Sequence, residues 1–285
     1  MQIKHYDEAI ADLDSAVAIN PNDPAHYGNR AIAWFWKGKY DQAIADCDEM
    51  LRLDPKAVGA LNVRARAYMA KGDHAGALID LTEAVRLQPK DSTAYLNRAG
   101  VLSALGKHAE AITDLDQAIQ LNPRLPMAFN NRAMEFIYSR QLDRALVDAN
   151  EAIRLDPKDP HFYQTRGHVH YGKKEYREAL ADYKEAVQRD EHFADGYRSL
   201  AWALATCSDP AVRNGKLAVQ YGKVACALVD SNEPWAVDAL AAAFAEAGDF
   251  NAAIAQEEKA LTLAGDNIGF HHRLALYKEH TPFRD

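Results

Sequence analysis

Mostly apolar residues recur along this chain with a spacing that places them on one face of a helix. A first stripe has the i, i+3, i+4, i+7 spacing and consists of Tyr27, Arg30, Ala31 and Trp34. A second stripe of the same kind follows Gly38 and consists of Tyr40, Ala43, Ile44, Cys47 and Met50. Pro55 then forbids a continued helix. The pattern predicts two helices, A and B, that form a hairpin with its turn at Gly38.

The hairpin pattern repeats along the chain. A proline recurs at 34-residue intervals, at Pro21, Pro55, Pro89, Pro123 and Pro157. A small residue keeps the same step, at Ala9, Ala43, Ala77, Ala111, Ala145 and Ala179. One hairpin alone cannot bury both of its stripes, whereas stacked hairpins can. The sequence therefore predicts an all-α array of stacked hairpins.

The repeated residues resemble those of a known family. The motifs Tyr27-x-x-Arg30-Ala31-x-x-Trp34, Gly38-x-Tyr40, Ala43-x-x-x-Cys47 and Pro55 are similar to the tetratricopeptide repeat. The resemblance implies an α/α superhelix, a solenoid of antiparallel hairpins that holds a partner in its concave groove. Arg30 stands where the family often has Leu, and Cys47 or Ala149 where a large aromatic residue is common; we expect these differences to affect packing only. The C-terminal arrangement resembles the ends of many bacterial members.

The register divides the chain into repeats of one solenoid, residues 1–285. Regular repeats are expected at 24–57, 58–91, 92–125, 126–159 and 160–193. A degenerate repeat with a lengthened turn follows at 194–233, then a last repeat at 234–265 and a capping helix at 266–285. Residues 1–23 match helix B alone. We expect either a truncated sequence or an open first hairpin that packs on another molecule.

Two charges also keep the repeat register. An arginine of helix A and an aspartate of helix B, 16 residues apart, are expected to face each other across each hairpin. The expected structural ion pairs are Arg30 with Asp46, Arg64 with Asp80, Arg98 with Asp114, Arg132 with Asp148, and Arg166 with Asp182. Both charges are replaced together in the degenerate repeat, which favours pairing within a repeat. A row of arginines for an acidic ligand is the alternative.

The remaining face of helix A is the expected partner-binding groove. Its residues are Asn29, Ile32, Trp36, Asn62, Arg66, Asn97, Asn130, Asn131, Met134, Tyr138, Gln164, His168, Tyr171, Arg198, Trp202 and Trp235. Carboxamides can donate to and accept from a peptide backbone, and aromatic and Met side chains supply anchoring area. Packing between helices is the alternative for the aromatic residues. The clamp with which some family members grip chaperone tails is incomplete, because its lysine positions hold Gly59, Thr93 and Met127.

Composition and charge limit the classes of partner that the chain is expected to bind. The chain has 33 Lys and Arg against 41 Asp and Glu, a net charge of -8, without a basic run. Nucleic acid is therefore not expected as a partner, because binding it requires clustered cations. The sequence shows no signal peptide and no apolar stretch long enough to cross a bilayer. The compartment stays open: cytoplasmic by default, periplasmic or secreted if the N-terminus is truncated.

No catalytic or metal site is expected. His168 and His170 are two residues apart on a helix and so diverge, and no Cys-x-x-Cys pair is present. Gly-rich phosphate loops and nucleophile elbows are also missing, so the sequence predicts a non-enzymatic chain without cofactors. The leading interpretation is a scaffold that binds a peptide or protein segment. The alternatives are self-association through the N-terminal half repeat, or the repeat region of a larger enzyme.

Overall fold

A computed structural model describes residues 2–230 and 232–285. Over these residues the chain forms helices α1 to α16 and no strand, which confirms the predicted all-α class. The helices form two compact units, and the boundary between the units along the chain falls between Glu135 and Phe136, within helix α8. Each unit is described by itself.

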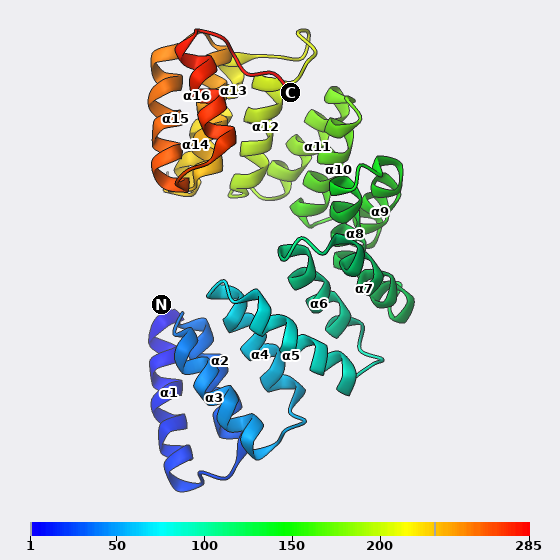
Figure 1. The fold of residues 1–285 in the computed structure, drawn as a ribbon, viewed down its shortest axis with the longest axis vertical. Helices are drawn as coiled ribbons and strands as arrows, with labels where there is room; N and C mark the ends of the chain where they lie inside the picture. Colours follow the sequence, from blue (N-terminus) through cyan, green and yellow to red (C-terminus); the bar gives the residue numbers. More distant parts are fainter. Residues whose placement is uncertain (1, 231) are drawn as a thin grey trace. The chain divides into compact units, whose positions relative to one another are not determined.

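The first unit holds three complete hairpins after a single helix (Figure 1). Its helices are α1 (Gln2–Ile19), α2 (Pro24–Trp36), α3 (Tyr40–Leu53), α4 (Val58–Ala70), α5 (His74–Leu87), α6 (Ser92–Ala104) and α7 (His108–Leu121). Helix α8 (Pro126–Tyr138) crosses into the second unit. Helices α2, α4 and α6 are the A helices of this unit.

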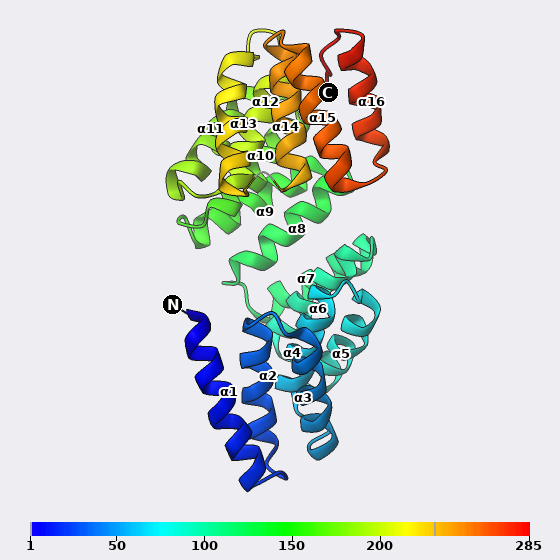
Figure 2. The same cartoon turned by 90° about the vertical axis from the view of Figure 1, so that its left-hand side faces the viewer.

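The second unit continues the alternation and ends in an additional helix (Figure 2). Its helices are α9 (Leu142–Leu155), α10 (Pro160–Gly172), α11 (Tyr176–Arg189), α12 (Ala194–Thr206), α13 (Gly215–Leu228), α14 (Pro234–Glu246), α15 (Phe250–Ala264) and α16 (Ile268–Lys278). Residues 207–214 form the long turn between α12 and α13, and α16 packs on α15. The A helices here are α10, α12 and α14.

Local hydrogen bonds fix the start of the A helices. Asp23, Asp91 and Asp159 each precede an A helix, and each side chain accepts from the backbone N–H two residues later. This satisfies an N–H that has no partner inside the helix. The hydroxyls of Tyr27, Tyr95 and Tyr163 donate to the carbonyls of Pro21, Pro89 and Pro157 at 3.1 to 3.3 Å. Helix A is thereby tied to the loop before it at every second repeat.

The turn between the two helices of a hairpin requires a left-handed residue. Gly38, Gly72 and Gly106 adopt φ values of 72 to 79°, which glycine tolerates because it lacks a Cβ. In the next two repeats the same position holds Arg140 and Lys174, at φ 60 and 63°. The turn is therefore kept by the packing of the hairpin even where glycine is absent.

Close helix packing depends on small residues. Ala43, Ala77 and Ala111 of the B helices are completely buried, and so, to within 1%, are Ala31, Ala65 and Ala99 of the A helices. At Gly167 an added Cβ would lie 2.4 Å from the Tyr183 ring. Position 183 is one where other repeats carry Cys47 or Ala149, so the larger aromatic side chain is accommodated by a smaller partner. These substitutions change packing and leave the hairpin intact.

Candidate binding surfaces

Asparagines of three successive A helices meet in the first unit. Asn62 of α4, Asn97 of α6 and Asn131 of α8 line a cavity of about 320 Å³. Its apolar lining comes from Met69, Leu81, Leu96, Val101 and Met127, with Ala65, Arg66 and Gly100 beside them. The Asn62 Oδ1 atom is buried and accepts no hydrogen bond within the described residues. The cavity thus combines an apolar floor with carboxamides that can still take a hydrogen-bonding partner.

A cation stands at one wall of this cavity. The Arg66 guanidinium lies over the Phe35 ring, 4.4 Å from its centroid, and 5.3 Å from the Trp36 centroid. Among the described residues no carboxylate lies within ion-pair distance of Arg66, whose side chain is exposed. Stacking on two rings holds the guanidinium in place while its N–H groups stay available. This wall can accept an acidic group.

The other predicted groove residues of α2 and α8 differ in exposure. Asn29 is exposed, and so are Ile32, Trp36 and Tyr138. Met134 is half-buried. Asn130 is buried, at 8% exposure, and its Oδ1 accepts no hydrogen bond from the described residues. A partner can reach the exposed residues but not Asn130.

In the second unit five predicted groove residues gather around two adjoining cavities. His168, Tyr171, Arg198 and Trp202 line one of about 230 Å³, together with Tyr183, Ser199 and Ala203. Arg198, Trp202 and Trp235 line the other, of about 250 Å³, with Asp238, Ala239 and Arg273. Burial lowers the pKa of His168 to about 4, so its ring is neutral at pH 7 and lies 2.9 Å from the Tyr183 hydroxyl. Gln164 is buried and donates to Ser199 and to the Asp195 carbonyl.

The chain's own last residue contacts this surface. The Trp202 Nε1–H donates to the Asp285 carboxylate at 2.8 Å, and the Tyr171 hydroxyl donates to the same oxygen at 2.7 Å. Thr206, at 0% exposure, places its hydroxyl 3.1 Å from that oxygen. Burial and the Asp285 carboxylate both raise the pKa of Tyr171 above its ordinary value. Part of the predicted groove is therefore occupied by this chain.

The sequence analysis missed several residues of this surface. Arg273 lies on α16, and its Nε donates to Asp238 at 2.6 Å and lies 3.4 Å from Glu257. Asp238 stands between apolar residues of α14, and Glu257 occupies the position at which other B helices carry Leu81 or Leu115. A carboxylate at an apolar position is a signal that could have pointed to a buried partner. Nothing in the repeat register points to Thr206, Phe283 or Asp285.

The arginines and aspartates of the repeats lie side by side within their hairpins. Bonds of 2.6 to 2.8 Å join four of the expected pairs, Arg30 with Asp46, Arg64 with Asp80, Arg98 with Asp114, and Arg166 with Asp182. Each of these four arginines donates through two nitrogens to both carboxylate oxygens, the geometry that guanidinium favours. Arg132 and Asp148 belong to different units, so their pairing stays a prediction.

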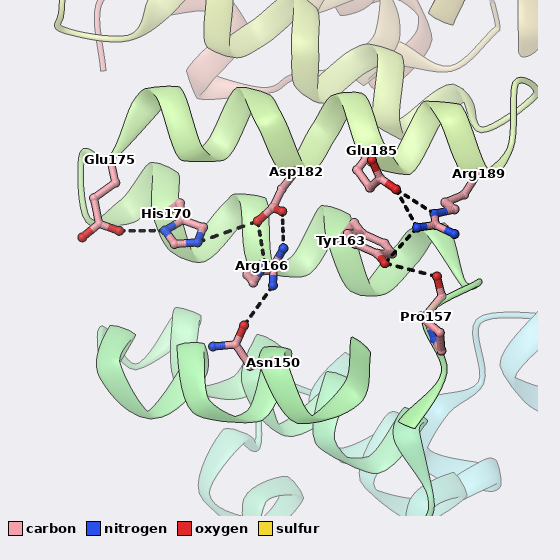
Figure 3. Close-up of polar contacts among 9 residues, drawn as sticks. All are labelled: Asn150, Pro157, Tyr163, Arg166, His170, Glu175, Asp182, Glu185 and Arg189. Atoms are coloured by element: carbon pink, nitrogen blue, oxygen red, sulfur yellow. Dashed lines mark hydrogen bonds and ion pairs between the residues drawn. The ribbon is translucent and has the colours of Figure 1, made fainter. Parts of the chain in front are cut away.

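The arginines also reach the preceding hairpin, which the sequence analysis did not predict. Arg30 donates to Asp14 at 2.7 Å and Arg132 to Asp116 at 2.6 Å. In Figure 3, Arg166 lies between Asp182 of its own hairpin and Asn150 of the helix before, at 3.0 Å from Asn150. The same view shows His170 between Glu175 and Asp182. The arginine row therefore links neighbouring repeats as well as the two helices of one repeat, and its N–H groups are directed to the protein's own carboxylates.

The cysteines and the other possible metal ligands do not cluster among the described residues. Cys47, Cys207 and Cys226 are buried thiols, and burial raises the pKa of each, that of Cys47 to about 12. Within the described residues no three His, Cys, Asp or Glu side chains come together as a metal site would require. No helix in that part of the chain is both long and apolar enough to span a bilayer.

Comparison with protein families agrees with the repeat geometry. Tetratricopeptide repeat profiles match residues 24–57, 62–126 and 130–192, more than half of the chain. The chain belongs to the tetratricopeptide repeat family. The predicted solenoid of helical hairpins is thereby confirmed. Members of this family bind peptides or proteins and are generally not enzymes, which supports a role in protein interaction.

Solved structures of the family share the fold at low sequence identity. The chain is similar to Cut9–Hcn1 of the APC/C (TM-score 0.74, 14% identity, 95% of this chain and 52% of that one). It is also similar to yeast Tom70 (TM-score 0.70, 19% identity, 98% and 59%). A third is YrrB, a tetratricopeptide repeat protein with an unusual peptide-binding site (TM-score 0.51, 22% identity, 65% and 95%). The chain thus spans only about half the length of the first of these structures. A comparison with curated protein sequences found no match.

Proposed function

We propose that this repeat protein binds an extended segment of a protein partner through the A-helix face of its first unit, and that it performs no catalysis. The observation that carries the proposal is the cavity lined by Asn62, Asn97 and Asn131. Carboxamides from three successive A helices can each donate to and accept from a peptide backbone. A row of such groups suits an extended chain, whose backbone polar groups recur along its length.

The surroundings of the cavity define the preferred ligand. Met69 and Met127 supply an adaptable apolar lining for one side chain of the partner. Arg66 offers a held guanidinium at the wall, without a carboxylate partner among the described residues. We expect a ligand with one apolar residue and a nearby acidic residue. The peptide-binding site named for YrrB is a precedent for such a function within the same fold.

Peptide display against the purified chain tests this proposal. Peptides selected on the wild type should bind the Asn97→Ala/Asn131→Ala variant about tenfold more weakly, because two hydrogen bonds of about 0.7 kcal/mol each are lost. Fluorescence anisotropy with each selected peptide measures the change. The Gln117→Ala/Gln120→Ala variant is the matched control, since it removes two exposed carboxamides from helix α7 outside the cavity. Equal affinity for wild type and both variants would refute the assignment of this cavity.

Self-association is the second candidate, favoured by helix α1, on which the apolar side chain of Ile19 is 85% exposed. Light scattering over a hundredfold range of concentration distinguishes the two functions. A constant mass with peptide binding supports the groove, and a mass that rises with concentration supports assembly.

A further inference from the structure

The segment after helix α16 lies across the A helices of the second unit. In Figure 1 the red chain end runs back from α16 to the C-terminal end of α12. The Asp285 N–H donates to the Thr206 carbonyl at 3.0 Å, so backbone as well as side chain is engaged. Arg284 donates to the Ala205 carbonyl at 3.2 Å. The contact is thus a short run of chain held at the end of α12.

Alternate side chains of this segment point in different directions. The Phe283 ring lies 5.8 Å from Trp202, and the Arg273 guanidinium is 5.6 Å from the Phe283 centroid. The Asp285 carboxylate meets Trp202 as well, through the indole N–H. Arg284, between them, forms an ion pair with Glu246 instead. This alternation is that of an extended peptide, in which residues i and i+2 face the same side.

The surface of α10 and α12 that contacts this segment has groups that bind a carboxylate, and it is not simply apolar. Three polar groups converge on one Asp285 oxygen: the Tyr171 hydroxyl and the Trp202 indole N–H donate to it, and the hydroxyl of the buried Thr206, which also donates to the Trp202 carbonyl at 2.9 Å, lies 3.1 Å away. They come from α10 and α12, and two of them, Tyr171 and Trp202, belong to the face predicted to bind a partner. Glu246 is also held by Arg213, at 3.1 Å, and so presents a fixed anion to a basic residue.

We propose that this surface binds a partner segment with an aromatic, a basic and an acidic residue in succession, and that Phe283-Arg284-Asp285 occupies it as an internal competitor. The proposal rests on the idea that A-helix faces of this chain bind peptides, but it concerns a separate surface. A tethered segment has an effective concentration near the millimolar range. A partner must therefore displace the segment. The partner's apparent affinity equals its affinity for the vacant site multiplied by the fraction of molecules in which the site is vacant.

The segment itself supplies the probe. A labelled, C-terminally amidated peptide with the sequence of residues 279–285 is titrated into the full chain and into Phe283→Ala/Asp285→Ala, which removes both groove-facing side chains. We expect the variant to bind the peptide at least tenfold more tightly than the wild type. Thr281→Ala is the matched control, because within the described residues the exposed Thr281 hydroxyl bonds only to the Glu279 carbonyl, and the variant should bind like the wild type.

Two further titrations identify the site. Adding Thr206→Val to the released variant should reduce the gain, because it removes a hydroxyl beside the carboxylate with little change of shape. Trp202→Phe should also reduce it, because it removes the indole N–H and part of the ring that contacts Phe283. A peptide with Asn in place of the last Asp should bind the released variant at least tenfold more weakly. Adding Asn97→Ala/Asn131→Ala should leave tail-peptide binding unchanged, so failure of the first-unit cavity and failure of this surface are distinguishable.

Some outcomes would overturn the proposal. Equal peptide affinity of the wild type and the released variant would show that the segment only caps the last hairpins. A wild-type mass that rises with concentration, and does not rise in the released variant, would show that a second copy supplies the segment. If the double variant does not give the wild-type circular dichroism spectrum, the isosteric Asp285→Asn variant takes its place. The Trp202 indole N–H resonance should then shift on substitution, and an unchanged resonance would contradict the contact.

Discussion

The two kinds of charge cluster in this chain are built differently. In a regular hairpin such as that of Arg98 and Asp114, the arginine side chain keeps 21% exposure and the aspartate side chain 6%. In the last repeats Arg273 meets Asp238 and Glu257, whose side chains are 3% and 0% exposed. The first arrangement matches one cation with one buried anion. The second places two carboxyl groups beside one cation, away from water.

The difference shows that contacts between arginine and carboxylate side chains have two different roles in this chain. A partly exposed pair keeps some solvation and costs little to form, so it can be repeated in hairpin after hairpin. A buried cluster with one positive group cannot hold two ionised carboxylates. Burial and the Asp238 carboxylate therefore raise the pKa of Glu257, which stays protonated beyond the usual range of a glutamic acid. Substitutions in the two clusters should differ in size and in pH dependence.

The largest effect is expected for Arg273→Ala. This variant leaves Asp238 and Glu257 buried without a cation and should lower the free energy of unfolding by about 4 kcal/mol at pH 7. Urea unfolding monitored by circular dichroism measures the loss. Arg154→Ala is the control, because Arg154 is exposed and, in the part of the chain that the structure describes, pairs only with Glu151 one turn away. This variant should change stability by less than about 0.5 kcal/mol. Similar values for the two variants would mean that the buried cluster contributes no more than a surface pair.

Asp114→Ala should have the next largest effect, about 3 kcal/mol. It removes the only carboxylate bonded to Arg98 among the described residues and leaves the guanidinium partly buried. Asp116→Ala, on the same helix, is its matched control. Asp116 is 49% exposed and bonds to Arg132 through a single oxygen, so we expect a loss below about 1 kcal/mol. Equal thermal stability of Asp114→Ala and wild type would remove the structural role of the paired charges.

Glu257→Gln tests the pH dependence of the buried cluster. Because the folded-state pKa of Glu257 is raised above its ordinary value of 4.5, the folded chain binds this proton more tightly than the unfolded chain does. Its contribution to stability is therefore full below pH 4.5 and is lost as the pH rises through the folded-state pKa. Glutamine cannot ionise, so the variant should lose less stability from pH 6 to pH 10, by about 4 kcal/mol, because the folded wild type ionises Glu257 only at a pKa of about 9. Parallel stability profiles for the variant and the wild type would contradict a protonated Glu257.

The sequence was sufficient for the features that repeat. The hairpins and the turn positions follow from local patterns of residue type, because each recurs at the 34-residue step. The second contact of the arginines does not follow from the pattern within one hairpin, because Asp14 and Asp116 lie on the preceding helix. The face predicted to be open also included Asn130 and Gln164. Both are buried, since exposure depends on how one A helix turns over the next. Asp285 could not be placed at all, because it follows the last repeat and has no equivalent in the register.

The smallest effect is expected where the repeat pattern itself is broken. The second arginine contact falls on Asp14, Asp48, Asp116 and Asn150, and the same register position beside Arg98 holds Thr82. A cavity of about 400 Å³ opens there, lined by Thr82 and Arg98, so a longer side chain has room. Thr82→Asp should supply the second carboxylate and raise the free energy of unfolding by about 0.5 kcal/mol at low salt. The gain should vanish in about 1 M salt, because an exposed pair is screened.

The same substitution in the Asp114→Ala variant should raise the free energy of unfolding by more than it does in the wild type, since Arg98 then has no other carboxylate bonded to it among the described residues. Recovery no larger than the effect on the wild type would show that the two contacts of the arginine act independently.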